Sequence, residues 1–406
     1  MKKIKKLLAV ILAVTVITSV SATSLGAYAA ENNSSAVLAD TEQDATLQAV
    51  SDKLASTSDY LLKLPAPSVG SFGGEWLVIG LARNNTISES FVSGYRTNIE
   101  SFVEEVGSSK LSSTKSTDNS RVILALSSLG IDARNIAGYD LTEPYADLEY
   151  IEGQGLNGPV FTLIALDTFN YEIPVDSTVS EQTTREKLID YILENAVENG
   201  GWTFWGTTAD PDMTGMAIQA LAPYYNKNEK VKAAVDKALD VLSDMQDENG
   251  GYASWGTVNS ESCAQVITAL ASLGIDPSKD SRFIKNNKSV VDALLSFGCE
   301  NGFMHTADSG YNQMATEQAF YALVSYKRVA SANTSLYNMS DVEPKSVKYD
   351  INGDGKIDVN DATLIQKFVS KFAEPTLSQS VRADLDDNGS ITVRDATIIQ
   401  KYISAA

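Results

Sequence analysis

The twelve residues 350–361 read DINGDGKIDVND and carry oxygen-bearing side chains at alternating positions. A loop of this length binds Ca²⁺ through six positions, because this hard cation takes six to eight oxygen ligands. In loop order, these positions are held by Asp350, Asn352, Asp354, Lys356 (through its carbonyl oxygen), Asp358 and Asp361. Gly355 at position 6 permits the sharp turn that such a loop makes. The stretch therefore predicts a calcium-binding loop.

A second copy of the loop follows near the end of the chain. Its corresponding positions are Asp384, Asp386, Asn388, Ser390, Thr392 and Asp395. The sequence continues as DATLIQKFVS at 361–370 after the first loop and as DATIIQKYIS at 395–404 after the second. Both continuations have an apolar stripe at helical spacing, whereas Pro344 lies where a helix entering the first loop would be expected. We therefore expect two repeats, each a loop followed by one helix, that together hold two Ca²⁺ ions.

This duplicated tail resembles a type I dockerin over residues 348–406. The resemblance implies a calcium-dependent module that attaches secreted enzymes to a cohesin on a cellulosome-type scaffold. It also implies that loop positions 10 and 11 and a Gln-Lys pair on each following helix face the cohesin. These residues are Val359, Asn360, Gln366 and Lys367 in the first copy, and Val393, Arg394, Gln400 and Lys401 in the second. Because the copies differ little, we expect either half to face the cohesin; the alternative is a structural calcium hairpin without a partner.

The middle of the chain predicts a helical repeat. Six short segments, rich in small apolar residues and ending in leucine, recur at intervals of roughly 40–55 residues: 75–81, 120–126, 160–166, 215–221, 264–270 and 318–323. Longer amphipathic segments alternate with them: 44–62, 92–106, 139–150, 184–197, 230–245 and 289–297. The short set, which has little charge, suggests an inner ring of helices, and the long set, which has one charged face, suggests an outer ring. We therefore predict an all-α protein, an (α/α)₆ toroid followed by the small calcium-binding domain.

Turns of glycine and an aromatic residue precede several inner segments, as at Gly200-Gly201-Trp202, Gly250-Gly251-Tyr252 and Gly302-Phe303. With these turns, residues 44–330 resemble the prenyltransferase/squalene-cyclase repeat and the α/α-toroid superfamily. The expected organisation is a signal peptide at 1–30, the toroid at 44–330, a linker at 331–347 and the dockerin at 348–406.

The resemblance offers a weak catalytic candidate in the toroid. Class II terpene cyclases protonate an alkene with an Asp-x-Asp-Asp run at the start of an inner helix. Here the run reads Asp210-Pro211-Asp212-Met213, with Asp212 at the donor position and Met213 in place of the last aspartate. The plainer alternative is that Asp212 is an N-cap or first-turn acid that the helix dipole favours.

Two other chemistries occur in helical toroids of this kind. The sequence closest to a prenyltransferase zinc site is Glu261-Ser262-Cys263 together with His305. Glutamate replaces the aspartate of that site and the spacing fits poorly, so no zinc is expected. A glycoside hydrolase or lyase needs paired carboxylates across a cleft. The acids available for such a pair are Glu75, Glu143, Asp147, Asp210, Asp212, Glu261 and Glu317, and sequence alone does not pair them.

Aromatic residues in the turns before inner helices should gather at one mouth of the toroid. We expect Trp202, Tyr252 and Phe303 to wedge neighbouring repeats together. Additional aromatics at Phe204, Trp205 and Trp255 are the better candidates for stacking on a sugar ring or an apolar ligand.

The net charge restricts the partners of the protein, and the amino-terminal sequence restricts its location. The formal net charge of −20 excludes a nucleic-acid partner, because no basic stripe is present. Residues 1–30 combine four lysines, an apolar run and the small-x-small sequence Ala27-Tyr28-Ala29, which predicts export without a membrane span in the mature chain. A disulfide between Cys263 and Cys299 is left open.

The sequence thus predicts a secreted, extracellular component held on a cell-surface or cell-free multienzyme complex. Its partner is a cohesin, and its setting is polysaccharide breakdown. The toroid is either a carbohydrate-active enzyme, a non-catalytic module that binds glycan or another ligand, or a terpene-cyclase-like enzyme. Carboxylates converging in the cavity would favour the first hypothesis, and an aromatic-lined mouth without such a pair would favour the second. The third requires Asp212 deep in an apolar cavity.

Overall fold

A computed structural model describes residues 45–71, 74–343, 349–352, 357–375, 377–386 and 388–405. The predicted signal peptide lies outside these residues, as do Asp354 and Lys356 of the first loop. The chain divides after Ser51 into two units. In the first unit, residues 45–51 are helical, and the second unit begins with helical residues 52–61. None of the described helices is both long and apolar enough to cross a lipid bilayer.

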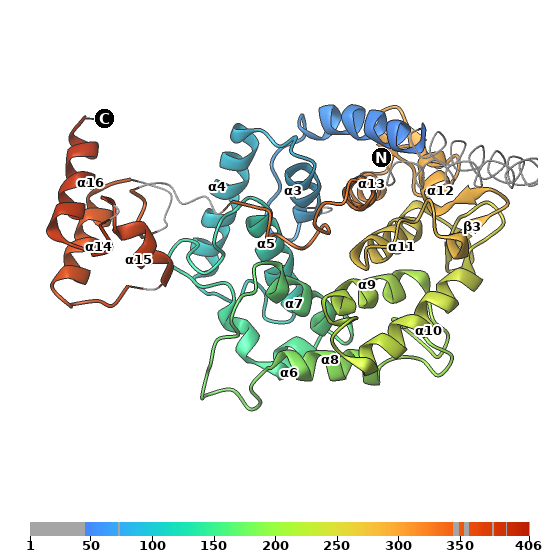
Figure 1. Ribbon diagram of the computed structural model, residues 1–406, viewed down its shortest axis with the longest axis horizontal. Helices are drawn as coiled ribbons and strands as arrows, with labels where there is room; N and C mark the ends of the chain where they lie inside the picture. Colours follow the sequence, from blue (N-terminus) through green and yellow to red (C-terminus); the bar gives the residue numbers. More distant parts are fainter. Residues whose placement is uncertain are drawn as a thin grey trace, which may run out of the picture. The chain divides into compact units, whose positions relative to one another are not determined.

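All six predicted inner helices are present, and the all-α prediction is confirmed. They are α3 (Gly74–Arg83), α5 (Ser116–Ser128), α7 (Asn157–Thr168), α9 (Pro211–Leu221), α11 (Ser260–Ser272) and α13 (Gln313–Ala330). Each packs against the next, and α13 packs against α3, so the six close a ring (Figure 1). Small residues allow this close approach: a Cβ atom at Gly80 of α3 would lie 2.7 Å from the ring of Phe320 in α13.

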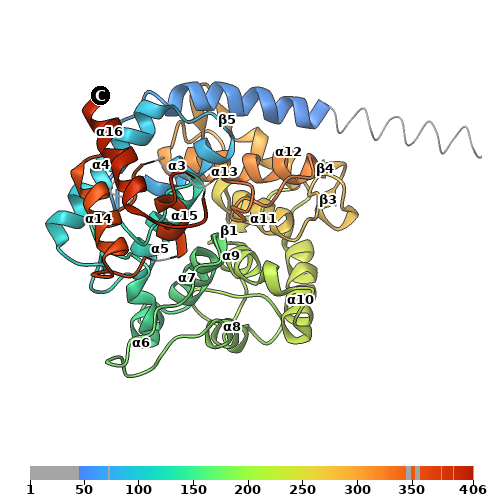
Figure 2. The ribbon, with the colours of Figure 1, turned by 60° about the vertical axis from the view of Figure 1, so that its left-hand side comes forward.

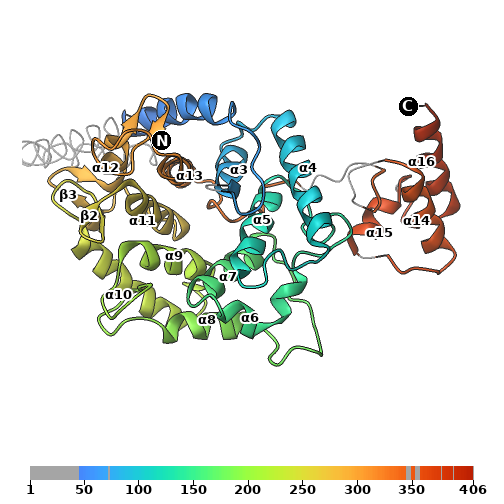
Figure 3. The same cartoon turned by 180° about the vertical axis from the view of Figure 1, so that it is seen from behind.

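The outer helices lie around this ring, as Figure 3 shows from behind. They are α4 (Glu89–Val106), α6 (Leu148–Glu152), α8 (Arg185–Glu194), α10 (Glu229–Met245) and α12 (Val290–Ser296). Helical residues 52–61 occupy the remaining outer position (Figure 1). Short 3₁₀ turns lie at Glu143–Ala146 (η1), Ala222–Tyr224 (η2) and Ser281–Phe283 (η3).

Three short β-hairpins, in which each strand has two residues, complete the described part of the toroid. They pair β1 (Ala253–Ser254) with β2 (Thr257–Val258), β3 (Ile284–Lys285) with β4 (Lys288–Ser289), and β5 (Gly298–Cys299) with β6 (Gly302–Phe303). All three pairs are antiparallel. The first hairpin packs against the start of α9 (Figure 2).

The predicted difference in helix length is wrong. The inner helix α13 has 18 residues, whereas the outer helices α6 and α12 have five and seven. The segment 139–150, predicted as one amphipathic helix, is a loop followed by η1 and α6. Pro144 lies at the start of η1, and the Asp147 side chain then caps α6 by accepting a hydrogen bond from the Tyr150 amide at 3.3 Å. The proline and the cap therefore divide the segment.

The aromatic residues of the glycine turns are fully buried wedges. Trp202, Tyr252 and Phe303 each have no exposed surface. The indole of Trp202 donates to the carbonyl of Ile192 in α8, and the Tyr252 hydroxyl donates to that of Leu242 in α10. Trp202 and Tyr252 therefore each tie the preceding outer helix to the ring.

Residues 331–343, placed in the predicted linker, pack on the ring. Leu336 and Met339 are completely buried. The carboxylate of Asp341 accepts a hydrogen bond from Arg83 of α3 at 2.8 Å and another from Arg328 of α13. The segment therefore links the first and last helices of the ring, and the folded part of the toroid continues past residue 330.

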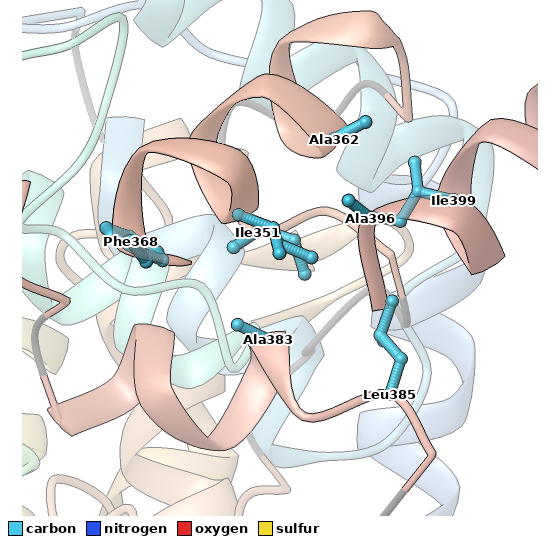
Figure 4. Close-up of a cluster of buried hydrophobic side chains, with 8 residues drawn as sticks. Ile351, Ala362, Phe368, Ala383, Leu385, Ala396 and Ile399 are labelled. Carbon is cyan, nitrogen blue, oxygen red and sulfur yellow. The ribbon is translucent and has the colours of Figure 1, made fainter. Parts of the chain in front are cut away.

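The C-terminal domain contains α14 (Val359–Val369), α15 (Leu377–Ala383) and α16 (Val393–Ala405). A small core joins them, with matching contributions from the two repeats (Figure 4). Ile351 and Leu385 are each the second residue of a loop, and Ala362 and Ala396 follow the last loop residue in each copy. Helix α15 was not predicted. It ends directly before the second loop, which therefore has a helix on each side.

Candidate functional site

Three carboxylates of the second loop lie close enough to bind one cation. Oxygen atoms of Asp384, Asp386 and Asp395 are all within 4.8 Å of one another, and these are loop positions 1, 3 and 12. Backbone amides orient the first of them: the Asp384 carboxylate accepts hydrogen bonds from Asn388 at 3.0 Å and Gly389 at 2.7 Å. Hard carboxylate oxygens held in this way suit Ca²⁺.

The last aspartate of each loop closes it in the same manner. One oxygen of Asp395 accepts from the amides of Leu385 and Asp386, at 2.8 and 3.3 Å, and the other accepts from Thr392 at 2.8 Å. Burial would raise the pKa of Asp395, but its hydrogen bonds from Thr392, Leu385 and Asp386 outweigh that effect and lower the pKa. The carboxylate is thus held ionised inside the loop.

The first loop shows the same closure. The carboxylate of Asp361 accepts hydrogen bonds from the amides of Ile351, Asn352 and Asp358, at 2.7, 3.1 and 2.9 Å. These three donors are loop positions 2, 3 and 9, the same positions that bond Asp395 in the second loop. Asp358 also accepts a hydrogen bond from the Asn360 amide and caps α14. The duplication seen in the sequence therefore extends to the hydrogen bonds.

The eight residues assigned to cohesin contact are all exposed. Val359 and Val393, at the starts of α14 and α16, keep 63% and 59% of their surface exposed although both are apolar. The two copies differ at loop position 11, where Asn360 corresponds to Arg394. The guanidinium of Arg394 lies 3.1 Å from the carboxylate of Asp386, so the second copy carries one more positive charge on this surface.

At the mouth of the toroid, Asp210 is the N-cap of α9. Its carboxylate accepts a hydrogen bond from the Met213 amide at 2.8 Å. Asp212 lies in the first turn of the same helix. Burial raises the pKa of Asp212, and the hydroxyls of Ser262 and Ser254 act in the opposite direction. The capping role considered for Asp212 therefore belongs to Asp210.

Of the residues that resemble a zinc site, Glu261 and His305 contact each other. The ring nitrogen Nδ1 of His305 lies 2.8 Å from a carboxylate oxygen of Glu261. Cys263 is fully buried, and burial raises the pKa of its thiol to about 12, which disfavours the thiolate that a metal would require. Cys263 and Cys299 are both free cysteines.

The centre of the ring holds a partly enclosed cavity of about 230 Å³, lined by side chains from all six inner helices. The lining residues are Trp76, Thr117, Arg121, Asn157, Phe161, Met216, Gln265, Gln318, Tyr321 and Tyr337. Within the described part of the chain, the lining contains no carboxylate residue, and Asp212 is not part of it. Among the described residues, Asp212 therefore lies outside this cavity, and the lining offers no carboxylate pair.

Two buried glutamates lie behind this lining. Glu75 has no exposed surface, and one of its oxygens is 3.3 Å from the guanidinium of Arg121. Burial raises the pKa of Glu75 to about 7 against the opposing effect of Arg121. Burial raises the pKa of Glu317 to about 8, although Gln313 donates a hydrogen bond to it at 3.0 Å. These carboxyl groups are therefore largely or partly protonated at neutral pH.

The cavity residues were missed at the sequence level. Arg121, Gln265 and Gln318 are polar residues in the otherwise apolar or small-residue inner segments, at the sixth position of α5, α11 and α13. A charged or amide residue recurring at one register of buried helices is the signal that could have found them.

The additional aromatics of the mouth are strongly exposed. Trp205 and Trp255 keep 70% and 90% of their surface exposed, and the ring centroids of Phe204 and Trp205 are 4.8 Å apart. Trp255 lies in the turn between β1 and β2, where its φ angle of 53° is in the left-handed region. All three predicted stacking residues are thus accessible to a ligand.

A search of curated proteins finds no match to the chain. Residues 348–404 match the family model of the dockerin type I domain, and for this segment the resemblance predicted from the duplicated loops is confirmed.

Proposed function

We propose that this protein attaches itself to a cohesin through calcium-dependent docking of residues 348–404. A dockerin type I domain implies a cohesin partner in a cellulosome-type complex, and domains of this type generally bind Ca²⁺. The observation that carries the proposal is the cluster of Asp384, Asp386 and Asp395, whose carboxylate oxygens lie within 4.8 Å of one another.

In this proposal, each loop holds one Ca²⁺ through the positions predicted from the sequence. The ligands are Asp350, Asn352, Asp354, Lys356, Asp358 and Asp361 in the first loop, and Asp384, Asp386, Asn388, Ser390, Thr392 and Asp395 in the second. Bound calcium neutralises several carboxylates that otherwise repel one another. The repeated closure by Asp361 and Asp395 supports the same role for both loops.

Calcium would act on the cohesin surface through the helix starts. Val359 and Val393 directly follow loop position 9 and begin α14 and α16. A metal that fixes the loop therefore also fixes the first turn of each helix, where the exposed valine and its polar neighbour would contact the cohesin. The Gln366-Lys367 and Gln400-Lys401 pairs lie further along the same helices.

The direct test is capture of the full-length protein on immobilised type I cohesins with calcium or with a chelator. We expect retention in millimolar Ca²⁺, loss of retention in EDTA, and recovery when excess Ca²⁺ is restored, because the ligand set is ordered by the metal. Equal capture with and without the chelator, or no capture by any cohesin of a broad panel, would contradict the proposal.

For the toroid, we propose a role in binding glycan at its mouth, within an extracellular complex that acts on polysaccharide. The observation that favours it is Trp255. A bulky residue at positive φ costs about 1–2 kcal/mol, and an exposed indole recovers none of that cost by burial. Asn or Gly normally occupies such a turn position. A binding role explains why a tryptophan stands there, since strained residues cluster at functional sites.

This role makes a prediction with opposite signs for stability and binding. Trp255→Asn is expected to raise the unfolding free energy of the protein by about 1 kcal/mol, because asparagine tolerates the left-handed conformation. The same change should weaken retention on insoluble polysaccharide roughly five- to tenfold, through loss of stacking. Thermal unfolding and depletion assays measure the two effects.

Phe372→Ala serves as the control, since this aromatic is 87% exposed but lies in the dockerin domain. It should leave retention unchanged. Unchanged retention in Trp255→Asn and in a Trp205→Ala/Trp255→Asn double variant would contradict a glycan role for the mouth. Release of reducing ends by the unaltered protein would show that the toroid is an enzyme instead.

A further inference from the structure

The central cavity has the size of a site for one small ring. Its volume of about 230 Å³ corresponds to roughly eight water molecules at about 30 Å³ each. Because most of its walls come from the six inner helices, with Tyr337 added by the packed segment 331–343, their positions are set mainly by the closed ring. Binding pockets of this kind are usually preformed.

One side of the cavity is an aromatic wall. The ring centroid of Trp76 lies 5.6 Å from that of Phe161, 5.7 Å from Tyr321 and 6.5 Å from Tyr337. These residues come from α3, α7, α13 and the packed segment 331–343. A flat ligand with apolar faces would lie against this wall.

Polar groups are supplied to the cavity by a chain of hydrogen-bonded side-chain amides from α9, α11 and α13. Gln219 donates to Gln265 at 3.0 Å, and Gln265 donates to Gln318 at 3.1 Å and to the Tyr321 hydroxyl at 2.7 Å. The chain therefore uses oxygen atoms of Gln265, Gln318 and Tyr321 as acceptors. Gln318 and Tyr321 both line the cavity, and the hydrogen bonds of this chain use only their oxygen atoms, as acceptors.

Charge at the cavity is nearly balanced. The guanidinium of Arg121 lies 3.3 Å from Glu75 and 3.6 Å from Asp118, and its Nε atom has no partner in the described structure. One oxygen of the fully buried Glu75 also lacks a partner there. A strongly charged ligand would upset this balance, whereas the hydroxyl groups of a neutral ligand can accept hydrogen bonds from Arg121, Gln318 and Tyr321.

We propose that the central cavity binds one neutral sugar ring, with its apolar face on Trp76 and its hydroxyls on Gln318, Tyr321 and Arg121. This inference rests on the proposed glycan role of the toroid and adds a second subsite to it. The docking function does not depend on it.

The test measures binding of small probes to the full-length protein by calorimetry and by indole fluorescence. The probes are neutral methyl glycosides of several hexoses and pentoses, a methyl uronate and a short isoprenoid alcohol. We expect saturable binding of at least one neutral glycoside. Tyr321→Phe keeps the aromatic wall but removes the hydroxyl donor, so it should weaken that binding about tenfold.

Tyr326→Phe is the matched control, because this buried tyrosine of α13 bonds Ser278 outside the cavity. It should retain the affinity, and thermal unfolding should show both variants folded. Preferred binding of the uronate or the isoprenoid alcohol would overturn the neutral-sugar assignment, as would the absence of binding by every neutral glycoside. If Trp205→Ala abolishes glycoside binding while Tyr321→Phe leaves it intact, the sugar binds at the mouth, and the cavity inference fails while the glycan role stands.

Discussion

Altering one Gln-Lys pair of the dockerin domain is expected to reduce cohesin affinity only about twofold, whereas altering both pairs should reduce it more than about 100-fold. The variants are Gln366→Ala/Lys367→Ala, Gln400→Ala/Lys401→Ala and their combination. Each pair lies exposed on its own helix, and the sequence and hydrogen bonds of the two copies match. If either copy can face the cohesin, the untouched copy still binds. Calorimetry against one cohesin measures all three affinities.

The copies are not identical, and the experiment can exploit that difference. Arg394 adds a positive charge to the second surface where the first has Asn360. We therefore expect the variant that retains only the second pair to show the steeper loss of affinity with salt. A loss approaching that of the combined variant when only one pair is changed would show that a single surface is used, and the proposal of two interchangeable faces would be wrong.

Removing one calcium loop should be more damaging than removing one face. Asp395→Ala deletes a proposed ligand together with a carboxylate that holds three loop amides. We expect calcium affinity at this loop to fall at least about 100-fold and cohesin affinity to fall roughly 30-fold or more. The reason is the shared core: α14 and α16 pack on one another, and a domain this small depends on its metal for stability.

Calcium titration followed by calorimetry and circular dichroism measures this effect, with one ion bound per chain instead of two. Asp361→Ala should behave alike, since Asp361 closes the first loop in the same way. Glu374→Ala removes one exposed acid of the same domain outside both loops and should change neither stoichiometry nor affinity. If Asp395→Ala binds two ions with unchanged affinity, the second loop is not a calcium site.

The inner helices of the ring could be predicted from the sequence because small and apolar residues dominate them. Each contains a run of small and apolar residues, several follow a glycine-aromatic turn, and burial on most sides leaves no competing preference. The predicted helix lengths are wrong where a proline or a capping residue sets the end of a helix. Pro144 divides the segment 139–150 into η1 and α6, and the Asn312 cap starts α13 earlier than its apolar run. Helix α15 has little periodicity of its own and forms against the core of the dockerin domain.

The cavity residues and the packed tail could not be predicted from spacing. Glu75 and Arg121 are 46 positions apart in the chain, and only closure of the ring brings their side chains to 3.3 Å. Likewise, Leu336 and Met339 lie in a short segment that is mostly polar, and such a composition is typical of a linker. Their burial depends on a surface made by α3, α7 and α13, which no local window contains.

The clasp that Asp341 makes between Arg83 and Arg328 has a mechanical consequence. A protein anchored to a scaffold at one end and to an insoluble material at the other is pulled through the chain between them. That tension would reach the toroid through residues 331–343, where the side chains of Asp341 and Thr334 each accept hydrogen bonds from Arg83 of the first inner helix and Arg328 of the last. The two arginines would then resist peeling of the tail from the ring, so the seam of the toroid is reinforced where the load enters.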